Sequence, residues 1–355
     1  MKRFNRFIFL SNFSRFLIEI FIPIILYKNN NSLNSIIIFL LVRSLFSLIL
    51  LYPLYNFIVK VNIRVSLFLS IIPFILSYIF LYNYNLILLS LFCSISSHLY
   101  FISKNILTYD NLGENKIGKF SCNIMINTTI SSILGAFIGG YLLTCCKWNI
   151  VLSISVILFS ISTFYSYNIS IEKNKINYKE IFNKKNLNLK LFYAFEQFKF
   201  VTYSIFPLYI FIYVSNSFLN IGYFNLIVGI ASLVCIKLFT NRLDKNNKDY
   251  LIGITLLFCG ILIFKLEFLN LENFLIFALT EGIISKLYDT ISISKTYILK
   301  NTPINILLFE TYYSIGRVVI LTISLFISDI KYLLYFLIIG IFLSSFLGTK
   351  KINLK

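Results

Sequence analysis

The sequence predicts an all-helical membrane protein with twelve transmembrane helices in two pseudo-symmetric six-helix bundles. Three observations lead to this prediction: long apolar runs recur along the whole chain, Lys and Arg gather in alternate connecting segments, and short patterns of the first half recur in the second. Of the 355 residues, 58% are hydrophobic and 13% are charged. The mean hydropathy of +0.83 exceeds what a soluble domain of this length needs.

The apolar runs define the expected helices. A bilayer core needs about 20 apolar residues per helix, whereas a strand of a membrane barrel needs about 10 residues of alternating pattern. The runs here are of the longer kind. We predict helices over 7–27, 35–59, 65–82, 86–103, 121–146, 150–167, 191–214, 221–240, 250–269, 273–299, 306–327 and 332–347.

The charges of the connecting segments predict the orientation. With the N-terminus inside, cytoplasmic segments hold 21 Lys and Arg, whereas the outer segments hold four: Lys28, Lys147, Lys265 and Lys331. Cytoplasmic loops collect positive charge. We therefore expect a multi-pass protein of a bacterial inner (plasma) membrane with both termini in the cytoplasm. The net charge of +18 follows the same rule and does not indicate a nucleic-acid partner.

The longest connecting segment divides the chain. Residues 168–190 are rich in Lys and Asn and separate a first bundle, 1–167, from a second, 191–355. Two patterns recur across this linker at offsets of 184 and 188: Arg15-Phe16 with Pro23 as Lys199-Phe200 with Pro207, and Ser97-His98-Leu99-Tyr100 as Ser285-Lys286-Leu287-Tyr288. These matches indicate a parallel duplication, whose halves are related by an axis along the membrane normal.

One glycine-rich segment of the fifth helix connects this topology to a known family. Residues Gly135-Ala136-Phe137-Ile138-Gly139-Gly140 resemble the GPxxGG core of the fifth-helix motif of major facilitator superfamily antiporters, with Ala136 in place of proline. Small residues also allow ordinary close helix packing, and the two interpretations are compatible. The family's GxxxDRxGRR loop is degenerate here, since Lys60 and Arg64 remain but Val59 replaces the acid.

The resemblance implies a secondary transporter that works by alternating access, commonly as a monomer, and not an enzyme with a cofactor. It implies that helices one, four, seven and ten line a cavity. Helices two, five, eight and eleven would form the interface between the bundles, and three, six, nine and twelve would face lipid. The arginine motif that many proton antiporters carry in the fourth helix is absent, where His98 is the ionisable residue.

Ionisable residues inside membrane spans are costly and therefore mark candidate sites. Such residues avoid the middles of helices three, six, nine and twelve, and acid and base often share a helix face, as at Arg15 and Glu19, four residues apart. We predict a coupling and substrate cavity formed by Arg15, Glu19, Glu281, Lys286, Asp289, Glu310 and Arg317. We predict rim or gate roles for Arg43, Glu196, Lys199 and His98. Structural salt bridges are the alternative interpretation.

These features predict transport of a small organic solute, with protons or another ion as the coupling partner and Glu19 beside Arg15 as the proton carrier. A polar, amphipathic or zwitterionic solute fits the mixed charges. The sequence contains no GxxxxGK[ST] pattern, which an ATPase would need. One histidine and six cysteines without a CxxC pattern indicate neither a metal site nor an intramembrane enzyme. A non-transporting sensor of the same fold and a lipid or polysaccharide flippase remain alternatives.

Overall fold

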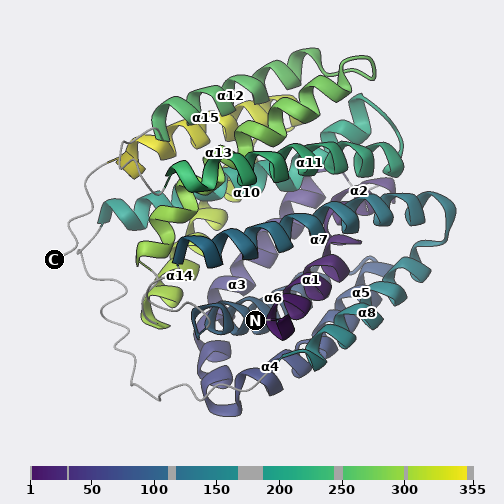
Figure 1. Cartoon of the computed structure of the whole chain (residues 1–355). Helices are drawn as coiled ribbons and strands as arrows, with labels where there is room; N and C mark the ends of the chain where they lie inside the picture. Colours follow the sequence, from purple (N-terminus) through teal and green to yellow (C-terminus); the bar gives the residue numbers. More distant parts are fainter. Residues whose placement is uncertain are drawn as a thin grey trace.

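A computed structural model describes residues 2–29, 32–110, 117–166, 187–243, 251–299 and 303–349 (Figure 1). Within these ranges the chain forms helices and no strand, which confirms the all-helical prediction. In chain order the elements are α1 (Lys2–Phe16), η1 (Glu19–Phe21), α2 (Ile22–Lys28), α3 (Leu33–Val61), α4 (Ile63–Leu69), α5 (Ile71–Tyr82), α6 (Leu86–Asp110), α7 (Ile117–Cys145), α8 (Trp148–Phe164), α10 (Leu187–Tyr213), α11 (Phe218–Leu243), α12 (Leu251–Phe268), α13 (Phe274–Leu299), α14 (Pro303–Ser324) and α15 (Ile330–Thr349).

Two of the predicted helices are interrupted. The first consists of α1, η1 and α2 in succession, and the third consists of α4 and α5, which meet at Ser70. Joined in this way, the described elements form twelve successive rods at the predicted places. Nine rods in the described ranges are long and apolar enough to cross a membrane. The other three are α8, with 17 residues, and α10 and α13, which carry charges of the candidate site, so for them the crossing stays a prediction.

The same rods pair in both halves of the chain. In the first half α1 packs against α7 and α8, and α6 packs against α3 and α5; in the second, α10 packs against α14 and α15, and α13 against α11 and α12. Between the halves, α7 packs along α11 (Figure 1) and α3 packs along α14. These four are the helices that the family resemblance places at the interface.

The predicted linker needs one correction. Residues 187–190, assigned to the linker 168–190, already form the first turn of α10. Lys190 in this turn is fully buried rather than part of a solvated basic loop. Residues 167–186 lie outside the described ranges, and the division of the chain into two bundles stays a prediction.

Glycines of α7 lie where it crosses its neighbours most closely. A Cβ atom on Gly135 would lie 2.8 Å from the Cβ of Phe16, and one on Gly139 would lie 2.2 Å from the carbonyl oxygen of Leu17. On Gly140 it would lie 2.6 Å from the carbonyl oxygen of Phe218 in α11. The glycine segment therefore brings α7 against α1 on one side and against α11 on the other.

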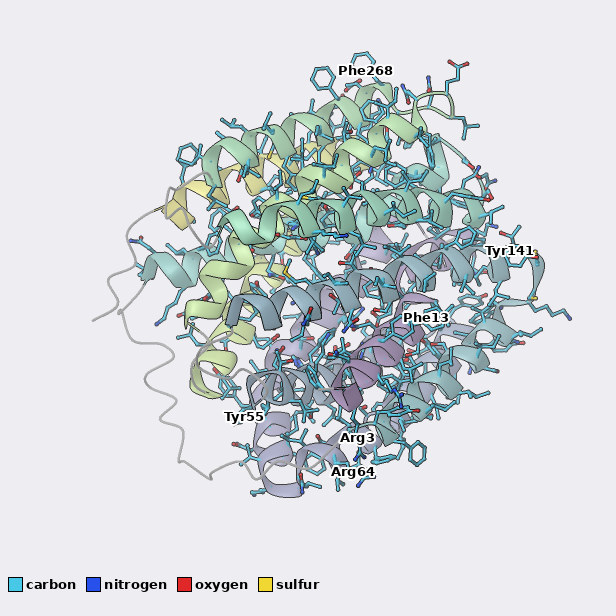
Figure 2. All side chains as sticks on the ribbon, viewed as in Figure 1. Arg3, Phe13, Tyr55, Arg64, Tyr141 and Phe268 are labelled. Atoms are coloured by element: carbon cyan, nitrogen blue, oxygen red, sulfur yellow. The ribbon has the colours of Figure 1, made fainter. Side chains whose placement is uncertain are left out.

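The outer surface of the bundle is apolar. Large side chains such as Phe268 project outward from the helices (Figure 2), and Leu256, Leu257 and Phe264 of α12 are all exposed. Contiguous exposed apolar surface of this kind suits contact with lipid tails.

Candidate functional site

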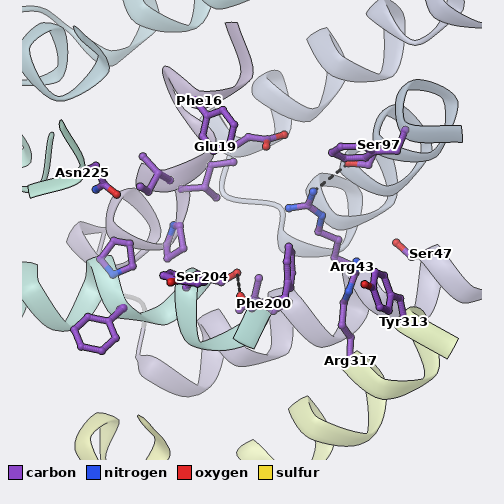
Figure 3. A pocket seen from close by; sticks show the side chains of 18 of the residues that line it. Phe16, Glu19, Arg43, Ser47, Ser97, Phe200, Ser204, Asn225, Tyr313 and Arg317 are labelled. Carbon is purple, nitrogen blue, oxygen red and sulfur yellow. Dashed lines mark hydrogen bonds between the residues drawn. The ribbon is translucent and has the colours of Figure 1, made fainter. Parts of the chain in front are cut away.

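A cavity of about 620 Å³ lies between the two halves of the chain. Its walls come from both halves, on α1, η1, α2, α3 and α6 and on α10 to α14. Aromatic rings make up much of the lining, and charged side chains converge among them (Figure 3). The volume is in the range that binds small organic molecules, about 300–1,000 Å³.

A break in the first helix brings Glu19 to the wall. In a continuous helix Pro23 would donate its backbone N–H to the carbonyl of Glu19, but proline has no N–H and its ring clashes with the preceding turn. The α-helix ends at Phe16. The amide of Phe21, which in a continuous helix would donate to the carbonyl of Leu17, donates to the carbonyl of Ile18 at 2.8 Å. The short η1 turn therefore begins at Glu19 and carries its carboxylate to the cavity.

Arg15 forms an ion pair with this carboxylate from the side away from the cavity. Its Nη2 lies 2.7 Å from Oε1 of Glu19, and its Nε donates to the same oxygen at 2.9 Å. The Arg15 side chain is 4% exposed, whereas the Glu19 side chain is 28% exposed. The guanidinium also lies 4.8 Å from the ring centre of Tyr100. The predicted pair is thus formed, but Arg15 lies beneath the wall and only Glu19 reaches the cavity.

A serine of α6 connects this pair to α3. Arg15 Nη2 and Arg43 Nη2 each donate to the hydroxyl oxygen of Ser97, both at 3.1 Å. Next to it, Nε2 of His98 lies 2.8 Å from the carbonyl oxygen of Ser47. Arg43 and Ser97 line the cavity (Figure 3), and so does His98. Arg43 and His98, which were predicted at the rim, therefore lie in the wall itself.

The second half contributes a stripe of α14. Glu310, Tyr313 and Arg317 line the cavity, as their spacing of three and four residues predicts. Arg317 donates from Nε to Oε1 of Gln197 at 2.6 Å, and its guanidinium lies 4.4 Å from the ring centre of Phe200. Glu310 interacts with Arg317 electrostatically.

Lys265 corrects the sequence analysis, which counted it with the outer segments and expected no charge in the middle of the ninth helix. It lies on α12, is 1% exposed, and its Nζ lies 2.5 Å from Oε2 of Glu281. The ammonium lies 3.7 Å and 4.1 Å from the ring centres of Phe206 and Phe224. The sequence did not predict this ion pair, because Lys265 lies near a helix end and sequence spacing does not show that it faces Glu281 of α13.

Lys104 corrects the sequence analysis in the same way. It was counted with the cytoplasmic segments, yet α6 continues past it to Asp110 and it lines the cavity. Its Nζ donates to Oδ1 of Asn12 at 3.2 Å. The predicted end of the fourth helix, residue 103, was too early for the sequence to place this lysine inside.

Several other predicted site residues lie away from the cavity wall. Lys199 of α10 forms an ion pair with Asp289 of α13. Glu196 accepts hydrogen bonds from Ser292 and from the hydroxyl of Tyr313, the latter at 2.6 Å. Lys286 and Asp289, predicted in the cavity, and Glu196 and Lys199, predicted at its rim, are absent from its lining. Glu196, Lys199 and Asp289 instead contact one another's helices where α10, α13 and α14 meet.

Comparisons with known proteins identify the architecture. A family model described as Major Facilitator Superfamily matches residues 7–319. A crystal structure of a bacterial homologue of the iron transporter ferroportin, in an outward-facing state, aligns with 13% identity and a TM-score of 0.70. The crystal structure of the human organic anion transporter MFSD10 (TETRAN) aligns with 10% identity and a TM-score of 0.64. Each alignment covers 98% of this chain and 98% of the other, and at such identity shows the fold alone. No curated protein matches the chain.

Proposed function

Because this chain belongs to the Major Facilitator Superfamily, and so is a multi-pass membrane transporter, we propose that it moves a small organic solute by alternating access, coupled to protons. The rocking bodies are the bundles 1–167 and 191–355, and the chain acts as a monomer. On the distribution of Lys and Arg, both termini lie in the cytoplasm of a bacterial inner membrane.

The environment of Glu19 is the observation that supports this proposal. It combines three properties of a proton carrier: it lines the cavity, it is partly exposed there, and its ion pair with a fully buried arginine depends on its charge. Protonation of Glu19 removes the negative partner of Arg15 and leaves that cation unpaired, which is costly inside a membrane. The charge on Glu19 therefore biases the arrangement of the interrupted first helix.

The contacts between the halves suit a rocking movement. At one end of the molecule the ring of Phe21, in η1, lies 5.7 Å from the ring of Phe218 in α11. Lys28 at the end of α2 lies 4.4 Å from the same Phe218 ring. A change at Glu19 is only two residues from the Phe21 contact. The proposed proton-binding residue and the contacts that must separate when this end opens thus lie on one short segment, η1 and α2.

The cavity favours a solute with both polar and apolar parts. Its lining includes four cationic side chains and three carboxylates, set among phenylalanine rings: Arg43, Lys104, Lys265, Arg317, Glu19, Glu281 and Glu310. This mixture suits a zwitterionic or amphipathic organic molecule.

The test uses purified protein in liposomes that contain a pH-sensitive dye. Panels of amino acids, aromatic acids and amines are screened for solute-dependent proton movement. We expect Glu19→Gln, which keeps the side-chain size but removes the titratable carboxylate, to abolish transport driven by a pH gradient. The matched control is Glu272→Gln, in an exposed turn, which should retain it. Unchanged proton-coupled flux in Glu19→Gln would show that another group carries the proton.

A further inference from the structure

We propose that Arg43 and Arg317 together form a subsite for the anionic group of the transported solute, in particular a carboxylate. The inference rests on the proposed function and names the substrate chemistry of the same cavity. The two residues come from opposite halves of the chain, α3 and α14, and both line the cavity. Figure 3 shows the two side chains facing the same region beside Tyr313.

Neutral hydrogen-bond partners hold both guanidinium groups. Arg43 donates from Nη2 to the hydroxyl of Ser97 at 3.1 Å, and Arg317 donates from Nε to the amide oxygen of Gln197 at 2.6 Å. A guanidinium carries five N–H donors in a planar fork. Each of these contacts occupies one edge of a fork and fixes its orientation, and it leaves donors for a ligand that accepts two hydrogen bonds.

Two other cations of this region, Arg15 beneath the wall and Lys265 in it, differ from Arg43 and Arg317 because each has a carboxylate partner. Arg15 has Glu19 and Lys265 has Glu281 within ion-pair distance. Among the described residues, no carboxylate lies within 4.0 Å of the Arg43 or Arg317 guanidinium. The two arginines are therefore cations of the cavity wall whose charge a bound anion can balance.

The charge balance favours an anion between them. Arg43 and Arg317 repel each other electrostatically across the cavity, and Glu310 attracts Arg317. The cavity wall as a whole carries four cationic side chains and three carboxylates, in a region where charge is poorly screened. A carboxylate bound to both forks would neutralise the excess, and charge-assisted bonds of this kind are about twice as strong as neutral ones.

The position of the subsite connects binding to movement. Because α3 and α14 pack along each other between the halves, an anion that bridges Arg43 and Arg317 attracts the two bundles toward one another. Such a ligand stabilises the conformation in which both arginines reach it. Ser97 also bonds to Arg15, so the same anion acts on a hydroxyl shared with the proposed proton site.

The test measures binding in detergent, where no gradient or transport is needed. The probes are three pairs of a carboxylate and its neutral amide, of increasing size: acetate and acetamide, benzoate and benzamide, 2-naphthoate and 2-naphthamide. Apparent affinities come from the dependence of the unfolding midpoint on probe concentration. We expect at least one carboxylate to bind roughly tenfold or more tightly than its amide, since charge-assisted hydrogen bonds are about twice as strong as neutral ones.

Substitutions assign that preference to the two residues. In Arg43→Gln and in Arg317→Gln the preference for the carboxylate should disappear, whereas Arg43→Lys should retain part of it. Arg6→Gln, at an exposed position outside the cavity, is the matched control and should behave as the unmodified protein. The proposal is wrong if no carboxylate exceeds its amide in the unmodified protein, a result that needs no folded variant, or if the preference survives both Gln substitutions.

The same measurement separates this inference from the proposed function. Glu19→Gln removes the proposed proton carrier but leaves both guanidinium groups, so the preference for the carboxylate should persist in that variant. Loss of proton-coupled flux together with intact discrimination supports both proposals. Discrimination that is intact in Glu19→Gln while that variant still moves protons supports the subsite and contradicts the proton carrier.

Discussion

Replacing Gly139 with alanine tests whether the crossing of α7 over α1 is as close as the structure shows. The added Cβ would lie 2.2 Å from the carbonyl oxygen of Leu17 and 2.9 Å from its carbonyl carbon. These are backbone atoms, which cannot turn aside as a flexible side chain can. The two helices would have to separate by about 1 Å to restore ordinary contact distances.

The size of the effect follows from a matched control. Gly260, in the middle of α12, has no heavy atom within 4 Å of its would-be Cβ. Gly→Ala in a helix interior gains about 0.5–1 kcal/mol from helix propensity alone, and this gain applies to both positions. Overpacking in a close contact costs about 1–3 kcal/mol. We therefore expect Gly139→Ala to be about 1–3 kcal/mol less stable than Gly260→Ala.

The assay compares the two variants in the same detergent by thermal unfolding. Gly260→Ala should unfold at or above the temperature of the unmodified protein, and Gly139→Ala should unfold below it. Transport should fall as well in Gly139→Ala, because Leu17 adjoins the break that carries Glu19. Equal stability of the two alanine variants would refute the reasoning, since the clash is the term that distinguishes them.

Two further predictions concern the charged network of the cavity. Lys265→Met and Glu281→Gln should each destabilise the protein by about 3 kcal/mol, because each leaves a buried charge unpaired. The double variant should unfold at a higher temperature than either single one, and additive losses would contradict a buried pair. Ser97→Ala removes the hydroxyl that both Arg15 and Arg43 contact. We expect it to lower the number of protons moved per solute while solute binding persists, and an unchanged ratio would show that Ser97 does not connect the two sites.

Spacing along a helix predicted some contacts of the site and misassigned others. Arg15 and Glu19, four residues apart, form the ion pair that their spacing predicts, even though the helix breaks between them. Glu196 and Lys199, three residues apart, bond in different directions, because Ser292 and Asp289 of α13 and Tyr313 of α14 lie closer to their charged ends. Spacing determines which side chains share a face and not which neighbouring helix meets that face.

The apolar runs, their lengths and the distribution of Lys and Arg determined the helical membrane fold, because water and lipid select those properties residue by residue. The two prolines show a feature that the sequence did not determine. Pro23 and Pro207 occupy matching places in the repeat and remove the same backbone hydrogen bond, yet α10 continues through Pro207 whereas the first helix breaks before Pro23. Gly139 crosses the first helix at Leu17, directly at the break, whereas Gly316 crosses α10 at Ala194, far from its proline. The position of a neighbouring helix is a property of the whole packed bundle, so only the tertiary structure decided which proline brings a carboxylate to the cavity.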